Sequence, residues 1–340
     1  MSIPASGGPS RPVARNRLGR SDVLVSALAL GGAPLAGLYR PVPEPVATAT
    51  VRAAWETGLH YVDTAPHYGL GRSEQLVGSV LRELPRDSFT LSTKVGRRLR
   101  PLAPGEAVDP QGFANAPPRR RYWDFTAAGI RSALLESLDR LGLDRVDIVL
   151  LHDPDDHEEE AIGTAFPALA RLRDEGVVGA IGAGMNQTAM LTRFVDRFDL
   201  DVVLCAGRYT LLDRSALADL FPACERRGTS VVIGGVYNSG LLADPRPGAR
   251  FDYAPAPEPT LRLAQETARL CAEHDVPVRA AALRFAAAHP VVAAVLVGCR
   301  SPAEVADNRA MWEHPIPAEL WDRLPLEPDP RPVRKRAHPG

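Results

Sequence analysis

Eight short apolar runs, separated by stretches with helical spacing, are the feature that most limits how this chain can fold. The runs are mostly continuous in apolar residues, as is typical of parallel strands buried on both faces. They lie at residues 27–30, 59–62, 89–93, 146–151, 177–181, 201–205, 230–233 and 291–297. The helical stretches lie at residues 46–57, 73–81, 126–141, 162–175, 188–198, 215–227, 260–274 and 279–288. Eight β/α units without a break in composition predict an α/β protein with a single (β/α)8 TIM barrel, and an open doubly wound sheet is the alternative.

Both ends of the chain differ from its repeating middle part. Residues 1–17 contain Pro, Gly, Ser and Arg without an apolar stretch, which predicts a disordered tail and argues against a signal peptide. Residues 18–25 are interpreted as an N-terminal hairpin, the barrel is expected over residues 18–324, and residues 325–340 form a second, Pro- and Arg-rich tail.

Two connections, residues 95–124 and 234–259, are long for loops without secondary structure. Loops of this length are usually functional, and both follow predicted strands. In a barrel such loops lie at the C-terminal rim, so we expect both of them over the active site.

The composition excludes several classes of protein. Apolar residues make up 45% of the 340-residue chain, which is enough for a large core. The formal net charge is −1 with both signs interspersed, so the expected partner is a small molecule and neither nucleic acid nor a membrane. The four cysteines are widely spaced and no apolar run reaches the roughly 18 residues that span a bilayer. These features predict a cytoplasmic protein with reduced thiols.

Ionisable side chains follow three consecutive predicted strands. Asp63 comes directly after the second strand, with Tyr68 five residues further on in a Pro- and Gly-containing loop. Lys94 follows the third strand and His152 follows the fourth. Each residue alone has an ordinary structural explanation, such as a helix cap or a solvated rim position. Neighbouring strands of a barrel bring their ends within side-chain reach, so the four residues together predict an active site.

The four side chains form a chemically coherent set. A Lys94 ammonium beside the Tyr68 phenol is expected to lower the pKa of that phenol from about 10 toward neutrality. Asp63 is expected to pair with Lys94, and His152 to hydrogen-bond a substrate oxygen near Tyr68. Such a group moves a proton to or from a hydroxyl or carbonyl, and its lack of a strong nucleophile favours redox chemistry over hydrolysis.

Asp63, Tyr68, Lys94 and His152, in this order at three strand ends, resemble the catalytic tetrad of the aldo-keto reductase family. The resemblance covers about residues 18–324. It implies a (β/α)8 barrel, an NAD(P) cofactor extended across the rim, and hydride transfer between its nicotinamide ring and a carbonyl or carbinol carbon. Tyr68 is then the general acid in reduction and the general base in oxidation.

Two further segments narrow the resemblance to one branch. Residues 231–242, VVIGGVYNSGLL, and 181–187, IGAGMNQ, are most similar to the bacterial branch of L-fucose or D-threo-aldose 1-dehydrogenases and pyridoxal 4-dehydrogenases. The implied reaction interconverts an aldose or alcohol and its lactone, aldehyde or ketone.

The resemblance also implies contacts to the cofactor. Asn186 is expected to hold the carboxamide, although Gly184-Met185 stand where the family commonly has Ser-Asn, and Ala206 stands where it often has Gln. Residues 238–241 are expected to offer backbone amides and small side chains to the pyrophosphate. The predicted cofactor contacts are Gly32, Asn186, Asn238, Ser239, Gly240, Leu241, Gly298, Arg300, Glu304 and Asn308.

Residues 298–308 are similar to the family's adenosine-binding segment. NADP-selective members commonly place a Lys near position 298 and an Arg near position 304, where they bind the 2′-phosphate. This chain has neither, and Glu304 would repel that phosphate, with Arg300 as a partial substitute. The sequence therefore predicts NAD in preference to NADP.

Tyr39 and Trp123 are the predicted substrate contacts, since a sugar-binding pocket is expected to combine an aromatic face with several polar groups. Trp123 lies in the long loop after the third strand. The sequence does not indicate which hydroxyl pattern is recognised.

Three other interpretations are open. Gly182-x-Gly184 after a strand is a weak dinucleotide fingerprint, because its third position is Gln187. Residues 152–160 are rich in possible metal ligands, as in a metal-dependent hydrolase, but no matching ligands end the other strands, so a solvated acidic loop is favoured and no metal site is predicted. A non-catalytic cofactor-binding regulatory protein on the same fold is disfavoured by the complete tetrad.

Overall fold

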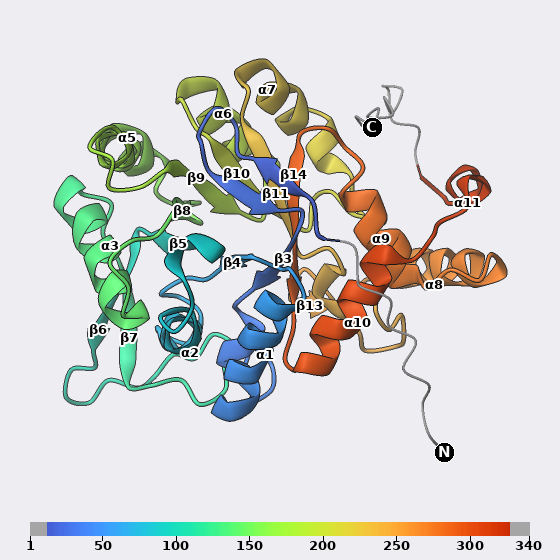
Figure 1. Cartoon of the computed structure of the whole chain (residues 1–340), viewed down its shortest axis with the longest axis horizontal. Helices are drawn as coiled ribbons and strands as arrows, with labels where there is room; N and C mark the ends of the chain where they lie inside the picture. The colour runs from blue at the N-terminus through green and yellow to red at the C-terminus, as the bar shows by residue number, and fades with distance from the viewer. Residues whose placement is uncertain (1–11, 327–340) are drawn as a thin grey trace.

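A closed barrel of eight parallel strands forms the centre of the computed structural model, which describes residues 12–326 (Figure 1). Each strand pairs with the next one along the chain and the last pairs with the first, so the (β/α)8 prediction is confirmed. The strands are β3 (Leu28–Gly31), β4 (Tyr61–Asp63), β5 (Thr90–Val95), β8 (Ile148–His152), β9 (Ala180–Met185), β10 (Val202–Ala206), β11 (Ser230–Gly234) and β14 (Val292–Gly298).

Helices surround the barrel, with α2, α3 and α5 on one side and α8 to α11 on the other (Figure 1). Their bounds are α1 Glu44–Glu56, α2 Arg72–Leu81, α3 Ala127–Leu141, α4 Glu158–Glu160, α5 Phe166–Asp174, α6 Thr188–Arg197, α7 Leu220–Arg227, α8 Glu258–Glu273, α9 Val278–Ala286, α10 Pro302–Glu313 and α11 Ala318–Arg323. Helices α10 and α11 were not predicted. The start of α10 does have a sequence signal, because Ser301-Pro302-x-Glu304 is a capping box with Pro at the first helical position.

A hairpin closes the N-terminal end of the barrel. Strand β1 (Arg15–Arg17) pairs antiparallel with β2 (Leu24–Ser26). The predicted tail over residues 1–17 is therefore wrong for Arg15–Arg17, and residues 1–11 lie outside the described residues. The apolar side chains of Leu18 and Val25 are fully buried against the inward-facing core of the barrel, which explains why the short hairpin is held there.

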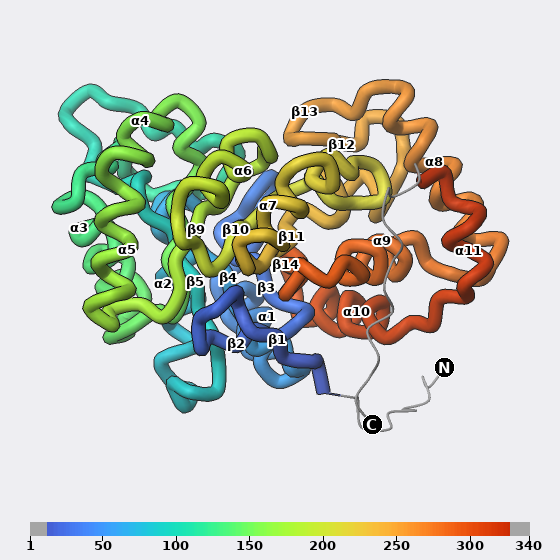
Figure 2. The backbone as a smooth tube through the Cα atoms, turned by 90° about the horizontal axis from the view of Figure 1, so that it is seen from above, coloured from blue at the N-terminus to red at the C-terminus, as the bar shows by residue number. Residues whose placement is uncertain are grey.

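Both long rim loops contain antiparallel hairpins, so the prediction that they lack secondary structure is wrong. Strand β6 (Arg97–Pro101) pairs with β7 (Arg119–Trp123), and β12 (Arg250–Phe251) pairs with β13 (Ala254–Pro255). Figure 2 shows β12 and β13 at the opposite end of the molecule from β1 and β2. Helix α11 ends at Arg323, close to the predicted limit of the barrel, and residues 327–340 of the predicted second tail lie outside the described residues.

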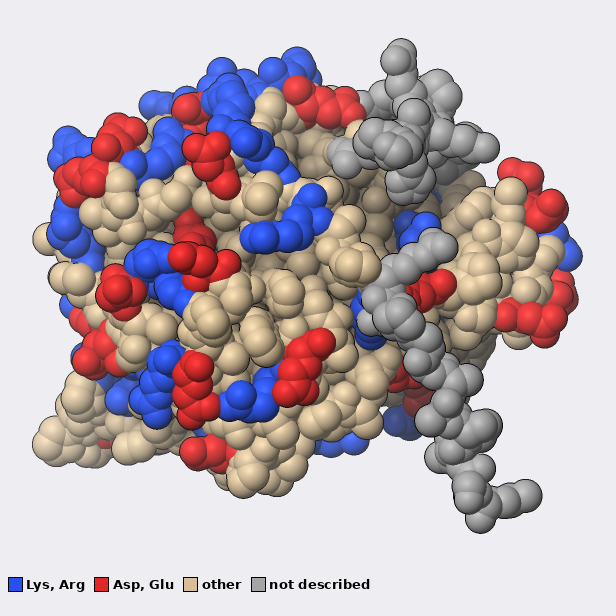
Figure 3. All heavy atoms as spheres, in the orientation of Figure 1, with Lys and Arg blue, Asp and Glu red and all other residues tan. Residues whose placement is uncertain are grey.

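Basic and acidic side chains are interspersed over the face shown in Figure 3. Within residues 12–326, no helix is both long and apolar enough to cross a membrane. All four cysteines are buried and none is in a disulfide.

Candidate active site

The ends of β4 and β5 and the loop after β4 meet at the Lys94 ammonium. Its Nζ donates to Asp63 Oδ2 at 2.6 Å, to the Thr64 carbonyl oxygen at 3.0 Å and to Tyr68 Oη at 3.1 Å. The Lys94 and Asp63 side chains are 2% and 3% exposed. A buried ion pair is tolerated when hydrogen bonds satisfy its donors, and here all three ammonium hydrogens have acceptors. The predicted pairing of Asp63 with Lys94 is confirmed.

Two further residues form a hydrogen-bond chain that orients the Asp63 carboxylate. Ser92 Oγ donates to Asp63 Oδ1 at 2.7 Å, and Tyr61 Oη lies 3.0 Å from Ser92 Oγ. Since the Ser92 hydrogen is used toward Asp63, the Tyr61 phenol is the donor to Ser92. Both residues are fully buried and were missed by the sequence analysis, although Ser92 stands two positions before Lys94.

The expected lowering of the Tyr68 pKa is wrong. Burial raises the pKa of Tyr68 well above 10, and the carboxylates of Asp63 and Asp153 raise it further. The Lys94 ammonium does not reverse this because Asp63, at 2.6 Å, balances its charge. Tyr68 therefore keeps its proton at neutral pH.

His152, at the end of β8, is next to Tyr68 as predicted. The two ring centroids are 5.8 Å apart, and the His152 side chain is almost fully buried. Burial lowers the pKa of His152 well below 6.5, and the neighbouring cations Arg97 and Lys94 lower it further, so the imidazole is neutral. Its buried Nδ1 has no hydrogen-bond partner within the described part of the chain, and its Nε2 lies 3.6 Å from Asp153 Oδ2.

Arg97 and Asp153 form an ion pair beside His152. Arg97 Nη2 donates to Asp153 Oδ2 at 2.8 Å, and the Arg97 guanidinium lies 4.5 Å from the centroid of the Trp123 ring. Trp123 also stacks on Phe125 at 5.5 Å. Asp153, in the acidic segment after β8, is therefore paired with Arg97 and is not simply solvated. The Trp123 ring packs against the guanidinium of Arg97.

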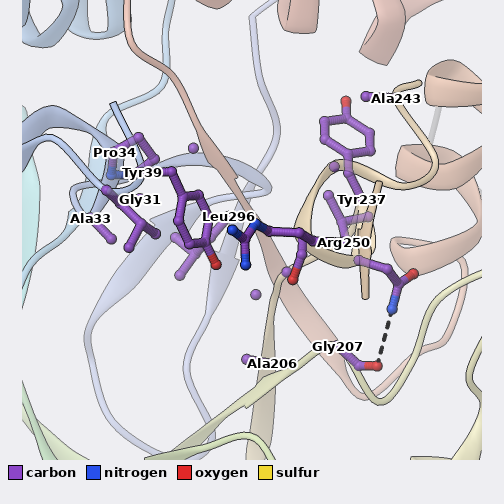
Figure 4. A pocket seen from close by; sticks show the side chains of 18 of the residues that line it. Gly31, Ala33, Pro34, Tyr39, Ala206, Gly207, Tyr237, Ala243, Arg250 and Leu296 are labelled. Carbon is purple, nitrogen blue, oxygen red and sulfur yellow. Dashed lines mark hydrogen bonds between the residues drawn. The ribbon is translucent and has the colours of Figure 1, made fainter. Parts of the chain in front are cut away.

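A cavity of about 830 Å³ runs across the rim from Tyr68 to the start of α10. In Figure 4, the Arg250 side chain points toward the ring of Tyr39, and its guanidinium lies 5.1 Å from the centroid of that ring. The predicted contacts that line it are Gly32, Tyr39, Asn186, Asn238, Ser239, Gly240, Gly298, Arg300, Glu304 and Asn308. Trp123 does not line this cavity, and neither do His152 and Asp153, so the substrate contact of Trp123 stays a prediction.

Leu241 is the predicted cofactor residue that the cavity does not include. Its side chain is fully buried and packs with Leu261 and Ala264. The amides of Asn238, Gly240 and Leu241 all donate to carbonyl oxygens inside their own turn, so they are not free for a pyrophosphate as expected.

Charges are paired at the far end of the cavity. The Ser301 hydroxyl caps α10, and Glu304 Oε2 accepts a hydrogen bond from the Arg300 backbone at 2.8 Å. Arg279, which was not predicted, binds the carboxylate of Asp307. Both acidic residues and both arginines line the cavity.

The cavity fits an extended dinucleotide in size and polarity. Its volume is within the range of cofactor sites. Asn238 is 2% exposed, and its Oδ1 has no hydrogen-bond partner among the described residues. Arg300 Nε is also buried and has no hydrogen-bond partner among the described residues. Buried polar atoms of this kind are expected to bind something, and a nucleotide offers both donors and acceptors.

Two further groups near the cavity were missed. Arg208 does not line the cavity, but it donates to the Asn186 carbonyl oxygen at 2.7 Å and to Asp252 at 2.6 Å, so it links the Asn186 loop to the β12–β13 hairpin. Tyr253, beside Asp252 in the hairpin turn, lines the cavity. These contacts join segments that no local sequence pattern connects.

Metal chemistry has no support in the site. Within residues 12–326, no three His, Cys, Asp or Glu side chains are arranged to hold a metal ion. The metal-dependent alternative therefore gains nothing from the residues 152–160 that suggested it.

Comparison with known proteins identifies the class. The model of the Aldo/keto reductase family matches residues 27–325, and the chain belongs to this family. It is similar to D-threo-aldose 1-dehydrogenase from Pseudomonas sp, with 43% identity over 89% of this chain and 94% of that protein. It is also similar to pyridoxal 4-dehydrogenase from Microbacterium luteolum, with 38% identity over 92% of this chain and 97% of that protein.

A solved structure of an aldo-keto reductase supports the same family. The holo form of an aldo-keto reductase from Bacillus halodurans superposes with a TM-score of 0.71 and 29% identity, covering 92% of this chain and 95% of that one. The two similar dehydrogenases carry the names of the predicted branch, and the chain is an oxidoreductase.

Proposed function

We propose that this protein is a nicotinamide-dependent aldose dehydrogenase that interconverts an aldose and its lactone, with Tyr68 as general acid and base. The observation that carries the proposal is the buried hydrogen-bond chain from Asp63 through Lys94 to Tyr68 at the wall of the cavity. The names of the two similar dehydrogenases support an aldose or another aldehyde as the substrate. When bound, the nicotinamide supplies or accepts the hydride.

Tyr68 handles the proton. Because Lys94 donates to Tyr68 Oη, the phenol's own hydrogen points away from Lys94 and is available to a substrate oxygen. In reduction Tyr68 gives this proton to the carbonyl oxygen, and in oxidation it takes the proton of the carbinol hydroxyl. The Lys94 ammonium stabilises the phenolate that forms in reduction. The neutral imidazole of His152 donates to the same substrate oxygen and orients it.

The residues along the cavity would hold the cofactor. Asn186 is proposed to bind the carboxamide, Asn238 and Ser239 the central part, and Arg300 the adenosine end, all from positions that line the cavity. NAD is proposed as the preferred cofactor, since Glu304 and Asp307 place two carboxylates near the proposed adenosine end and Asp307 already occupies Arg279. A cytoplasmic location, supported by four cysteines without disulfides, stays a prediction.

The test is turnover of NAD and NADP with a panel of aldoses, pyridoxal and simple aldehydes, with and without a chelator. We expect chelator-insensitive oxidation of at least one aldose, with the larger kcat/KM for NAD. Loss of activity on chelation would support the metal-dependent alternative. Tight cofactor binding without turnover of any carbonyl or sugar would favour a non-catalytic protein.

A further inference from the structure

Asp153 is a charged group beside the proposed proton donor that the reaction chemistry does not use. It follows His152 at the end of β8, and its Oδ2 lies 3.6 Å from His152 Nε2. The backbone at Asp153 is left-handed, with a φ of 38°, and its amide donates to the Gly184 carbonyl oxygen at 3.0 Å. Asp is among the few side chains that tolerate this conformation, which brings its carboxylate next to the imidazole.

The position of Asp153 is fixed by a second hairpin. Arg97, the first residue of β6, holds Asp153 Oδ2 at 2.8 Å and is itself supported by the ring of Trp123. The Asp153 side chain is still 29% exposed, compared with 16% for Arg97. A carboxylate has about four acceptor positions, so the bond to Arg97 leaves most of them for a ligand.

The chemistry of these neighbours defines what Asp153 is able to bind. A substrate oxygen bound by Tyr68 and by Nε2 of His152 would lie beside Asp153, because this nitrogen is 3.6 Å from Asp153 Oδ2 and the His152 ring is next to that of Tyr68. The oxygens on adjacent carbons of a sugar lie about one hydrogen-bond length apart. A hydroxyl on the carbon next to the reacting one therefore falls within reach of the Asp153 carboxylate.

We propose that Asp153 is a specificity-determining residue that accepts a hydrogen bond from the hydroxyl on the carbon adjacent to the reacting carbon, with Arg97 and Trp123 as positioning residues. The substrate class is then a neutral 2-hydroxy aldehyde or the corresponding aldose. This inference rests on the proposed function and names the feature of the substrate that the same site recognises. A hydrogen bond to a charged group is worth about 10- to 100-fold in selectivity.

The test removes each partner in turn, the hydroxyl from the substrate and the charge from the enzyme. L-Fucose and 2-deoxy-L-fucose are compared by kcat/KM with wild type and with Asp153→Asn. Asn has nearly the same shape as Asp and tolerates the left-handed backbone, so the variant is expected to fold. Asp156→Asn, in the same segment but exposed to solvent, is the matched control.

In wild type and in Asp156→Asn, kcat/KM is expected to be about 10- to 100-fold higher for L-fucose than for the deoxy sugar. In Asp153→Asn, this ratio is expected to be no more than a few-fold. In Asp153→Asn, the kcat/KM for L-fucose should fall more than that for the deoxy sugar, and the affinity for NAD, measured by fluorescence titration, should stay near that of wild type. An unchanged preference in Asp153→Asn, or an equal loss on both sugars, would overturn the inference and leave the proposed function intact. A wild-type protein that oxidises neither sugar, nor any other aldose, would overturn both.

Discussion

The two ends of the cavity are built in different ways. At the Tyr68 end, Asp63, Lys94 and His152 come from strand ends, and every hydrogen of the Lys94 ammonium has an acceptor. Along the rest of the cavity, the residues come from loops and the start of α10. Asn238 Oδ1 there and Arg300 Nε at the far end have no partner among the described residues, and at the Tyr68 end the same holds for His152 Nδ1. The Tyr68 end is preorganised for proton transfer, whereas the far end leaves hydrogen bonds for a ligand to complete.

The largest expected effect comes from breaking the Tyr68 end. Lys94→Met leaves the Asp63 carboxylate buried without its cation, so we expect a loss of about 3–5 kcal/mol in the free energy of unfolding. Turnover should fall by about 10²-fold or more, because the phenolate of Tyr68 loses its stabilising charge. Urea unfolding and steady-state kinetics measure the two effects.

A double variant separates stability from chemistry. Asp63→Asn combined with Lys94→Met removes both charges, so most of the stability should return while turnover stays low. Recovery of turnover in the double variant would show that the ion pair has only a structural role.

The pH dependence of kcat/KM tests the Tyr68 end of the cavity in the wild-type protein. The raised pKa keeps Tyr68 protonated at neutral pH, which is the form needed for reduction and the wrong form for oxidation. The kcat/KM for oxidation should therefore rise about tenfold per pH unit between about pH 6 and pH 9, while that for reduction stays flat and falls only at higher pH. A plateau of the oxidation rate below pH 8 would mean that the phenol titrates near neutrality, as the sequence analysis first expected.

The smallest expected effect lies at the far end. Asp307→Asn frees Arg279 for a 2′-phosphate, so the ratio of kcat/KM for NADP to that for NAD should rise by about tenfold or less, since this pair is partly exposed. Asp196→Asn, which removes the partner of Arg226 on the surface, is the control and should not change the ratio. An unchanged ratio in Asp307→Asn would place the 2′-hydroxyl away from Arg279.

The same contrast separates what the sequence predicts from what it does not. The barrel and the grouping of Asp63, Lys94 and His152 follow from apolar runs and the residues at their ends, which are local patterns. The β6–β7 hairpin was missed because its strands, rich in arginine, pair across residues 102–118 and lack an apolar alternation.

The sign of the Tyr68 pKa shift was also unpredictable, since it depends on how deeply three strand ends are buried together. In the turn of residues 238–241, three backbone amides donate to carbonyl oxygens of the turn, so the amides that the sequence predicts for a pyrophosphate are already hydrogen-bonded. Asp153 was visible in the sequence beside His152, but only its bond to Arg97, which is 56 residues away in the chain, distinguishes it from a solvated acid.

The most direct test is the rate at which NAD bound to the protein is reduced by an aldose in a single turnover, compared between wild type and Tyr68→Phe. This substitution removes only the phenol oxygen, so NAD affinity should be unchanged. We predict that NADH forms about 10²- to 10⁴-fold more slowly in Tyr68→Phe. Formation of NADH at the wild-type rate in Tyr68→Phe would contradict the assignment of proton transfer to this residue.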